Sequence, residues 1–269
     1  KNKLAVVGSL IIIVFVIMAI FAPIFATFDP NTTDLLNIRT SPNKVHILGT
    51  DDLGRDIFSR LLYGGRVSIA VGVASMMLQI LIGVTIGVIA GYFGGLIDKI
   101  IMRIVDIIMC FPFFVIAIAL AAVIGGSITN LVLIIGMLMW PVITRIVRGE
   151  VLVTKQNEYI LAAKALGFNT FEIIIHHIIP NIISAILVSS TLCIAQGILM
   201  EATLSFLGLG VNPPTPSWGN MLVAAQNMSV LSHKWWMWIP AGMSVVLIVL
   251  SVNFVGDGLR DALDVEKSV

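Results

Sequence analysis

The sequence predicts an all-α protein that crosses a membrane six times. Hydrophobic residues make up 58% of its 269 residues and charged residues only 12%, whereas soluble domains carry about 25% charged residues. So few charges cannot cover a surface that faces water. Six stretches are also apolar over the roughly 20 residues that a helix needs to cross a bilayer, where each backbone group must find its hydrogen bond within the segment.

The six apolar stretches are joined by connections of very different length. The first runs for 23 residues without a charge, longer than the apolar region of about 7–15 residues in a cleaved signal, so we expect a membrane span there. The third and fourth form one tract, which we divide at Gly125-Gly126-Ser127 because these residues favour a turn. The predicted spans are residues 4–26, 67–93, 100–124, 130–147, 182–206 and 235–255.

Lys and Arg residues predict the orientation of the spans. If both termini are inside, ten of the 16 Lys and Arg residues lie on the inner side and six on the outer side. Because cytoplasmic connections are enriched in these residues, we expect cytoplasmic termini. The chain then forms a single transmembrane domain with an outer loop at 27–66, an inner loop at 148–181 and a second outer loop at 207–234.

The first outer loop contains a candidate amphipathic helix. Thr50 can cap its N-terminus, acidic residues in the first turn favour the positive end of the helix dipole, and Gly64-Gly65 predicts its end. Oppositely charged residues stand four apart and predict two ion pairs, Asp51 with Arg55 and Asp56 with Arg60. The acids of this helix either contact a cation or a substrate loop, or form a solvated face that pairs with its own arginines.

The inner loop has the clearest local signals. A short helix is predicted from Asn157, its cap, to Gly167, which ends it either in a left-handed backbone conformation or at a close backbone contact. Asn169 and Glu172 resemble a capping box that opens a second helix, which runs to Pro180. Small side chains on the first helix permit the close approach of another surface, so this elbow is either a docking element or a structured linker.

The second outer loop is rich in Gly and Pro over residues 208–219. This composition excludes a helix. The loop contains Pro213, Pro214 and Trp218. We expect a rigid loop of defined shape, with a lid as one role.

Polar residues within the spans leave alternatives open. Asp106 stands one helical turn after Arg103, and a local ion pair is the simplest account. Glu201 either lines a path across the membrane or hydrogen-bonds a neighbouring helix. The same choice applies to three amides, Gln79, Asn130 and Gln196. A carrier driven by an ion gradient needs ionisable groups near the midplane, so two acids in the apolar tracts support it poorly.

Several chemical functions have no support in the sequence. No Gly-Lys dipeptide occurs, so the chain has no phosphate-binding GxxxxGK[ST] loop, and neither HExxH nor GxSxG is present. His176 and His177 are adjacent and diverge on a helix, while Cys110 and Cys193 stand apart in apolar runs. We therefore expect no catalytic residue and no metal site. The net charge of +1 gives no sign of a nucleic-acid partner.

The inner loop resembles a known transport motif. The spacing of Ala162-Ala163, Gly167 and Pro180 is similar to the EAA motif of ABC-importer permeases. Leu161 stands where that motif begins with Glu, and His177 stands at its Ile position. The outer segments 46–56, 59–68 and 204–219 look like those of the C-type permeases of dipeptide, oligopeptide and nickel importers. Together these segments are spread over the chain from residue 46 to residue 219.

The resemblance implies a permease subunit of the bacterial cytoplasmic membrane, without cofactor or catalysis of its own. It would pair with a homologous B-type permease, dock on two ATP-binding subunits that hold ATP and Mg²⁺, and receive cargo from an external solute-binding protein. The implied ATPase-coupling residues are Glu158, Ala162, Ala163, Lys164, Ala165, Leu166, Gly167, Phe168 and Pro180. The implied outer gate comprises His46, Gly49, Asp51, Arg55, Asp56, Pro213, Pro214 and Trp218, with Glu201 as a path candidate.

The cargo is less well defined than the family. Peptide and nickel importers share these loops, but no cluster of His, Cys and Met resembles a nickel site. Di- or oligopeptides, moved by alternating access, are therefore favoured over a nickel chelate. An ion-gradient-driven carrier and a structural membrane scaffold are the alternatives from other functional classes.

Overall fold

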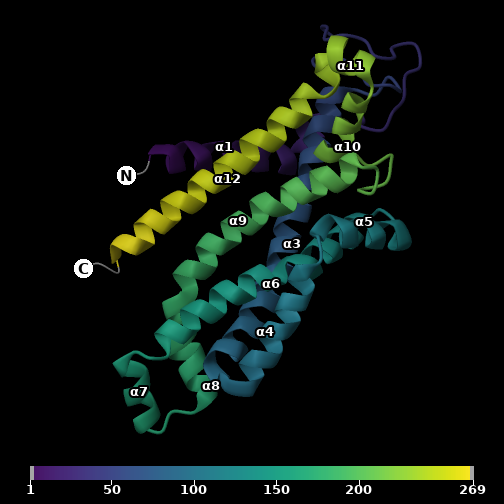
Figure 1. Ribbon diagram of the computed structural model, residues 1–269. Coiled ribbons are helices and arrows are strands. Elements are labelled where there is room, and N and C mark those ends of the chain that lie inside the picture. Colours follow the sequence, from purple (N-terminus) through teal and green to yellow (C-terminus); the bar gives the residue numbers. More distant parts are fainter. Residues whose placement is uncertain (1–2, 267–269) are drawn as a thin grey trace.

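Long helices dominate the computed structural model, which describes residues 3–266. Within this range, five helices are long and apolar enough to cross a membrane, or six if one bent pair counts as a span. The long helices in Figure 1 are α1 (Lys3–Ile20), α3 (Ile57–Phe93), α6 (Ile128–Thr154), α9 (Ile179–Phe206) and α12 (Ile239–Glu266), and the bent pair is α4 (Gly95–Cys110) with α5 (Phe113–Ile124). The predicted all-α, multi-span fold is confirmed.

Short helices lie at the two ends of this bundle. Figure 1 shows α7 and α8 at one end, and α11 beside the loop that follows α1 at the other. The short elements are α2 (Ala22–Phe25), α7 (Glu158–Ala165), α8 (Thr170–Ile173), a π-helix (Ile174–Ile178), α10 (Trp218–Leu222), α11 (Met228–His233), and 3-10 turns at Val223–Gln226 and Trp235–Met237. The predicted inner and outer loops therefore occupy opposite ends of the molecule.

Helix α3 is the centre of the packing. Three glycines four residues apart on α3 face three β-branched residues with the same spacing on α6: Gly83, Gly87 and Gly91 against Ile143, Val147 and Val151. A Cβ added at any of these glycines would lie 2.6–2.8 Å from the facing Cβ. Without these Cβ atoms the two backbones can approach closely, which is how helices associate inside a membrane.

The predicted outer amphipathic helix is wrong in both its start and its end. Asp56, rather than Thr50, caps α3, and its carboxylate accepts a hydrogen bond from the Ser59 backbone at 2.8 Å. The helix then runs through Gly64-Gly65 to Phe93. A Cβ at Gly65 would lie 2.9 Å from the ring of Trp218, so these glycines admit a packing partner and do not end the helix.

The predicted third span, 100–124, is not one straight helix. It divides at Phe111-Pro112 into α4 and α5, whose axes differ by 79°. Proline clashes with a helical conformation of the preceding residue and lacks an N–H for the helix ladder, and the ψ of Phe111 is accordingly 133°. Figure 1 shows α5 leaving the body of the bundle.

The predicted second helix of the inner loop does not end at Pro180. Pro180 lies in the first turn of α9, where a missing N–H is tolerated. The Asn181 side-chain amide donates to the His177 carbonyl at 2.6 Å, just before that turn. The helical segment Thr170–Phe206 is consequently one apolar run of 37 residues.

Candidate functional site: an inner elbow and an outer polar network

The inner elbow consists of α7, a turn at Gly167 and α8. Asn157 stands at the cap position before α7, but its side chain makes no cap hydrogen bond, so that part of the prediction is wrong. Gly167 has a φ of +86°. The Asn169 side chain accepts from the Glu172 backbone, and the Glu172 carboxylate accepts from the Asn169 backbone, both at 2.9 Å. The predicted helix–glycine–helix geometry and its capping box are confirmed.

The positive φ explains why glycine stands at position 167. No atom lies within 4 Å of a Cβ built there, so the residue is not required by a close backbone contact. Side chains disfavour left-handed φ values because Cβ crowds the neighbouring carbonyl. Of the two expectations for Gly167, the conformational one is confirmed.

The elbow is anchored to the bundle on one side only. Ile160 is fully buried and Ala163 is 6% exposed, both in a core cluster with α6 and the π-helix. The Lys164 ammonium lies 5.2 Å from the centre of the Tyr92 ring at the end of α3. The remaining residues of the predicted coupling set are exposed: Glu158, Ala162, Ala165, Leu166, Gly167, Phe168 and Pro180.

The outward side of the elbow is more apolar than its alanines suggest. We call the four large residues there the elbow patch: Leu161, Leu166, Phe168 and Phe171, exposed by 55%, 78%, 45% and 73%. Sequence reasoning missed Leu161 and Phe171 as surface residues. The available signal was the presence of large apolar residues in a loop that lies outside the spans.

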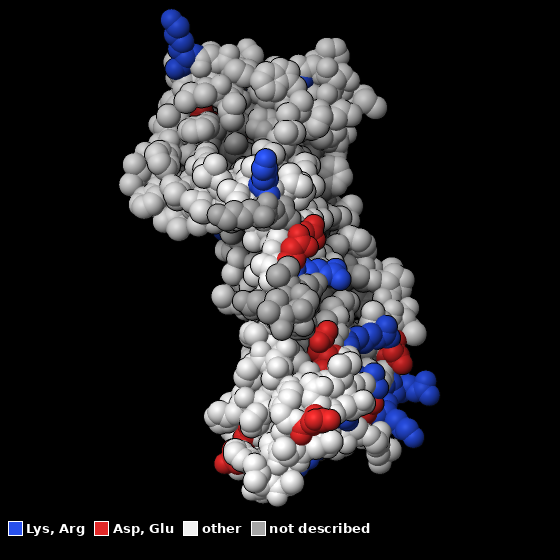
Figure 2. Space-filling model, turned by 90° about the vertical axis from the view of Figure 1, so that its left-hand side faces the viewer, with Lys and Arg blue, Asp and Glu red and all other residues white. Residues whose placement is uncertain are grey.

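Charged residues tie the helices together next to the elbow. Arg148 of α6 binds both carboxylate oxygens of Asp98 of α4 at 2.5 and 2.6 Å. Arg145 pairs with Asp106, so the predicted pair of Asp106 with Arg103 is wrong, because the α4–α6 contact supplies a closer arginine. On the face in Figure 2, charged side chains gather towards the end that carries α7 and α8.

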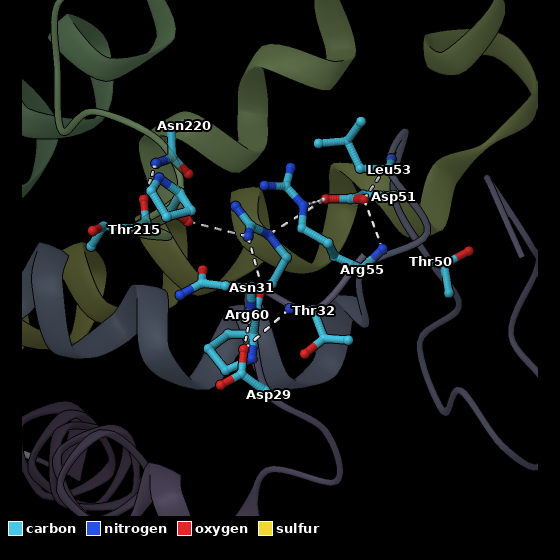
Figure 3. A network of polar contacts seen from close by, with 12 residues as sticks. Asp29, Asn31, Thr32, Thr50, Asp51, Leu53, Arg55, Arg60, Thr215 and Asn220 are labelled. Carbon is cyan, nitrogen blue, oxygen red and sulfur yellow. Dashed lines mark hydrogen bonds and ion pairs between the residues drawn. The ribbon is translucent and has the colours of Figure 1, made fainter. Parts of the chain in front are cut away.

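At the opposite end, Arg60 joins three segments of the chain (Figure 3). Its side chain is 6% exposed. The guanidinium donates to the carbonyls of Pro30 at 2.9 Å and Pro214 at 3.5 Å, and lies 3.5 Å from Asp51. Asp51 also accepts from Arg55 at 2.7 Å, as predicted. The predicted pairing of Arg60 with Asp56 is wrong, because the buried guanidinium turns towards backbone carbonyls.

Asp56 instead pairs with histidine. Its carboxylate lies 2.9 Å from His46 Nδ1, and both side chains are buried. The Phe28 ring packs on the imidazole with ring centres 4.7 Å apart.

Gly49 has a φ of +72°, and a Cβ there would lie 2.4 Å from the Thr40 carbonyl oxygen. The described residues contain no group of three or more acidic, His or Cys side chains placed for a metal, and the acids of this loop pair within the chain.

Glu201 of α9 connects the spans to the second outer loop. Its carboxylate is fully buried and accepts from the hydroxyls of Ser68 on α3 and Ser205, both at 2.7 Å. The same Ser68 oxygen accepts a hydrogen bond from the Trp218 backbone N–H at 3.1 Å, and the Trp218 indole N–H donates to the Leu61 carbonyl at 3.0 Å. The interhelical hydrogen bond expected as one alternative for Glu201 is confirmed. Pro213 lies exposed in the loop that precedes Trp218.

Comparisons with known proteins match nearly the whole chain. The family model described as binding-protein-dependent transport system inner membrane component matches residues 83–267. A second model, the N-terminal TM domain of oligopeptide transport permease C, matches residues 1–42.

Three relatives illustrate the similarity. The oligopeptide transport system permease protein OppC of Bacillus subtilis is 46% identical, covering 98% of this chain and 86% of the relative. The dipeptide transport system permease protein DppC of Alkalihalophilus pseudofirmus is 44% identical over the same shares. The glutathione transport system permease protein GsiD of Shigella flexneri is 42% identical, covering 98% and 87%.

Proposed function

This chain belongs to the family of binding-protein-dependent transport system inner membrane components, and from that premise we propose that it is one of two permease subunits in an ATP-driven peptide importer. It is a multi-pass inner-membrane transport subunit by its family. The partners that we propose are a homologous permease, two ATP-binding subunits and an external solute-binding protein, with both termini in the cytoplasm.

The observation that carries this proposal is the elbow and the helix that leaves it. The elbow patch is exposed at the tip of the molecule, whereas Ile160 and Ala163 anchor the other side. A rigid apolar surface of this kind is the type that another protein covers. We propose that each ATP-binding subunit docks on such an elbow, and that the residues predicted for coupling act there.

A continuous helical segment long enough to cross the membrane begins at the same elbow. The segment Thr170–Phe206 contains 37 residues, which span roughly 55 Å at helical rise. Its far half carries Glu201, whose contacts with Ser68 and Ser205 lead to Trp218 of the outer loop. Closure of the ATP-binding subunits would thus move the elbow, tilt this segment and open or close the outer end, as alternating access requires.

Short peptides are the cargo that we propose. The three relatives named above carry oligopeptide, dipeptide and glutathione transport in their names. The described part of the chain holds no group of three or more His, Cys, Asp or Glu side chains suited to a metal ion. The outer network around Arg60 and Trp218 is proposed as the region that receives the loaded binding protein.

Reconstitution of the four-subunit complex in vesicles tests the function. With the matching binding protein and the labelled cargo outside the vesicle and MgATP inside it, di- and oligopeptides should accumulate, and a nickel chelate should not. Accumulation should stop when ATP is replaced by a non-hydrolysable analogue. Peptide uptake driven by a proton or sodium gradient without ATP would contradict the proposal, and nickel uptake without peptide uptake would replace the cargo.

A further inference from the structure

Polar side chains within the spans differ sharply in how they are satisfied. Gln79 is 1% exposed, and its amide nitrogen has no hydrogen-bond partner within the described residues. The Asn130 amide donates to the carbonyls of Ile124 and Gly125 at 2.9 Å. The Gln196 side chain is exposed, and it makes no hydrogen bond within the described part of the chain. Of the three amides, Gln196 is therefore the one that is both exposed and without a hydrogen bond within the described residues, so a partner for it can come from outside this chain.

Gln196 belongs to one continuous face of α9. Leu192, Gln196 and Leu199 are exposed and stand three or four residues apart, and Thr203 continues the row. This spacing places the four on one side of a helix. We call this row the path face.

Towards the inner end, the path face enters a pocket. Ala185 and Val188, which continue the same spacing, line a pocket of about 240 Å³ between α6, α9 and α12. Glu150 and Arg260 lie on its other walls. Figure 1 shows α9 running between α12 and α6. One side of α9 thus carries an amide without a hydrogen bond, Gln196, in its outer half. In its inner half the same side lines the pocket that contains Glu150 and Arg260.

Hydrocarbon is a poor environment for this face. An amide without partners is costly in lipid, and polar groups inside a membrane generally face a bundle interior or a water-filled cavity. The contrast is α1, whose exposed residues at the middle of the helix, Leu10, Ile13 and Val14, are all apolar. We propose that the path face lines the translocation path, and that the Gln196 amide contacts the backbone of the peptide in transit.

The chemistry of glutamine fits such a cargo. Its side chain both donates and accepts hydrogen bonds, so it can pair with the C=O or N–H of any peptide whatever the peptide's side chains. Flanking leucines give weak apolar contact, and transport requires binding that is weak enough for release. This inference rests on the proposed function and assigns the residues of this chain that meet the cargo.

Thiol accessibility in the assembled transporter tests the path face. In a chain with Cys110 and Cys193 replaced by Ala, Gln196→Cys and Thr203→Cys are compared with Ile13→Cys on α1, using a charged, membrane-impermeant thiol reagent. Because such reagents need the thiolate, which forms in water, the two path-face cysteines should react at least about tenfold faster than the control. Saturating peptide should slow the reaction of Gln196→Cys.

The outcomes separate this inference from the proposed function. If the complex takes up peptide but both path-face cysteines react as slowly as Ile13→Cys with and without MgATP, lipid or a partner helix covers the face and the inference is overturned. If the cysteines react but the parent complex takes up no peptide, the path face stands and the cargo assignment fails. If peptide leaves the rate at Gln196→Cys unchanged during uptake, the proposed contact with cargo is overturned.

Discussion

The two ends of this molecule solve opposite problems. At the outer end, Arg60 bonds to the Pro30 and Pro214 carbonyls and Asp56 to His46, while the buried indole nitrogens of Trp236 and Trp238 have no partner within the described residues. At the inner end, the elbow patch leaves four large apolar side chains exposed. The outer end is therefore organised by buried polar contacts within the chain, although Leu35 and Leu36 are also exposed there, by 69% and 96%. At the inner end, no comparable polar network covers the elbow patch within the described residues, and we expect a partner to cover it.

The largest effect should follow from placing a charge in the elbow patch. Phe171→Asp removes an apolar contact worth about 1.5–3 kcal/mol and leaves a carboxylate to be desolvated by the partner, so affinity for the ATP-binding subunit should fall about 100-fold or more. Because Phe171 is 73% exposed, the chain should still fold. Co-purification measures this.

The matched control is Leu36→Asp. Leu36 is 96% exposed at the outer end, so the same chemical change there should leave co-purification unchanged. Equal loss of the ATP-binding subunits from both variants would remove the distinction between the two ends.

Gly167→Val should uncouple ATP hydrolysis from transport. A β-branched residue at the φ of +86° costs about 1–2 kcal/mol or forces the elbow into another turn. This cost corresponds to an about 5- to 30-fold smaller population of the native elbow conformation. Peptide uptake and peptide-stimulated ATPase activity in the reconstituted complex measure it. Gly149→Val is the control, since Gly149 lies in helix α6 with open space around it and no positive φ; normal coupling in Gly167→Val would refute the elbow's role.

Glu201→Leu should weaken the contact between the helical segment Thr170–Phe206 and the second outer loop. The change removes the acceptor of the Ser68 and Ser205 hydroxyls, which costs about 1–3 kcal/mol of stability per buried group. The thermal midpoint of the complex should fall, and hydrogen exchange should rise at Trp218. Ser190→Ala removes a bond only to the Ile186 carbonyl of its own helix and should leave exchange at Trp218 unchanged.

Arg60→Lys should have the smallest effect. Lysine keeps the charge but lacks the planar fork that reaches two carbonyls and Asp51 at once, so we expect a loss of about 0.5–1.5 kcal/mol in the outer network. We expect faster proteolysis of the loop that follows α1 and unchanged binding of the ATP-binding subunits. Loss of those subunits would show that the two ends are not independent.

Local signals predicted the elbow well because its structure is local. The Asn169–Glu172 capping box and the turn at Gly167 depend on residues within four positions. Apolar composition likewise predicted the helical spans, because hydrocarbon forces each segment to satisfy its own backbone.

The failures involve residues far apart in the chain. Gly64-Gly65 predicts a helix end in isolation, but Trp218 packs against Gly65 from 153 positions away. Asp106 takes Arg145 as its partner in preference to Arg103, because packing of α4 on α6 brings that arginine within reach. Leu161 and Phe171 of the elbow patch were missed for a different reason, since a sequence does not show which apolar side chains stay uncovered after folding.

Cross-linking from the elbow tests the central claim most directly. Leu166→Cys, at a position 78% exposed in the elbow patch, and Leu36→Cys, at the outer end, are each coupled to a photoactivatable group in the assembled, cysteine-free complex. We expect Leu166→Cys to form a covalent product with an ATP-binding subunit and Leu36→Cys to form none with that subunit. A product between Leu36→Cys and an ATP-binding subunit, or no product from Leu166→Cys in a complex that still hydrolyses ATP and takes up peptide, would contradict it.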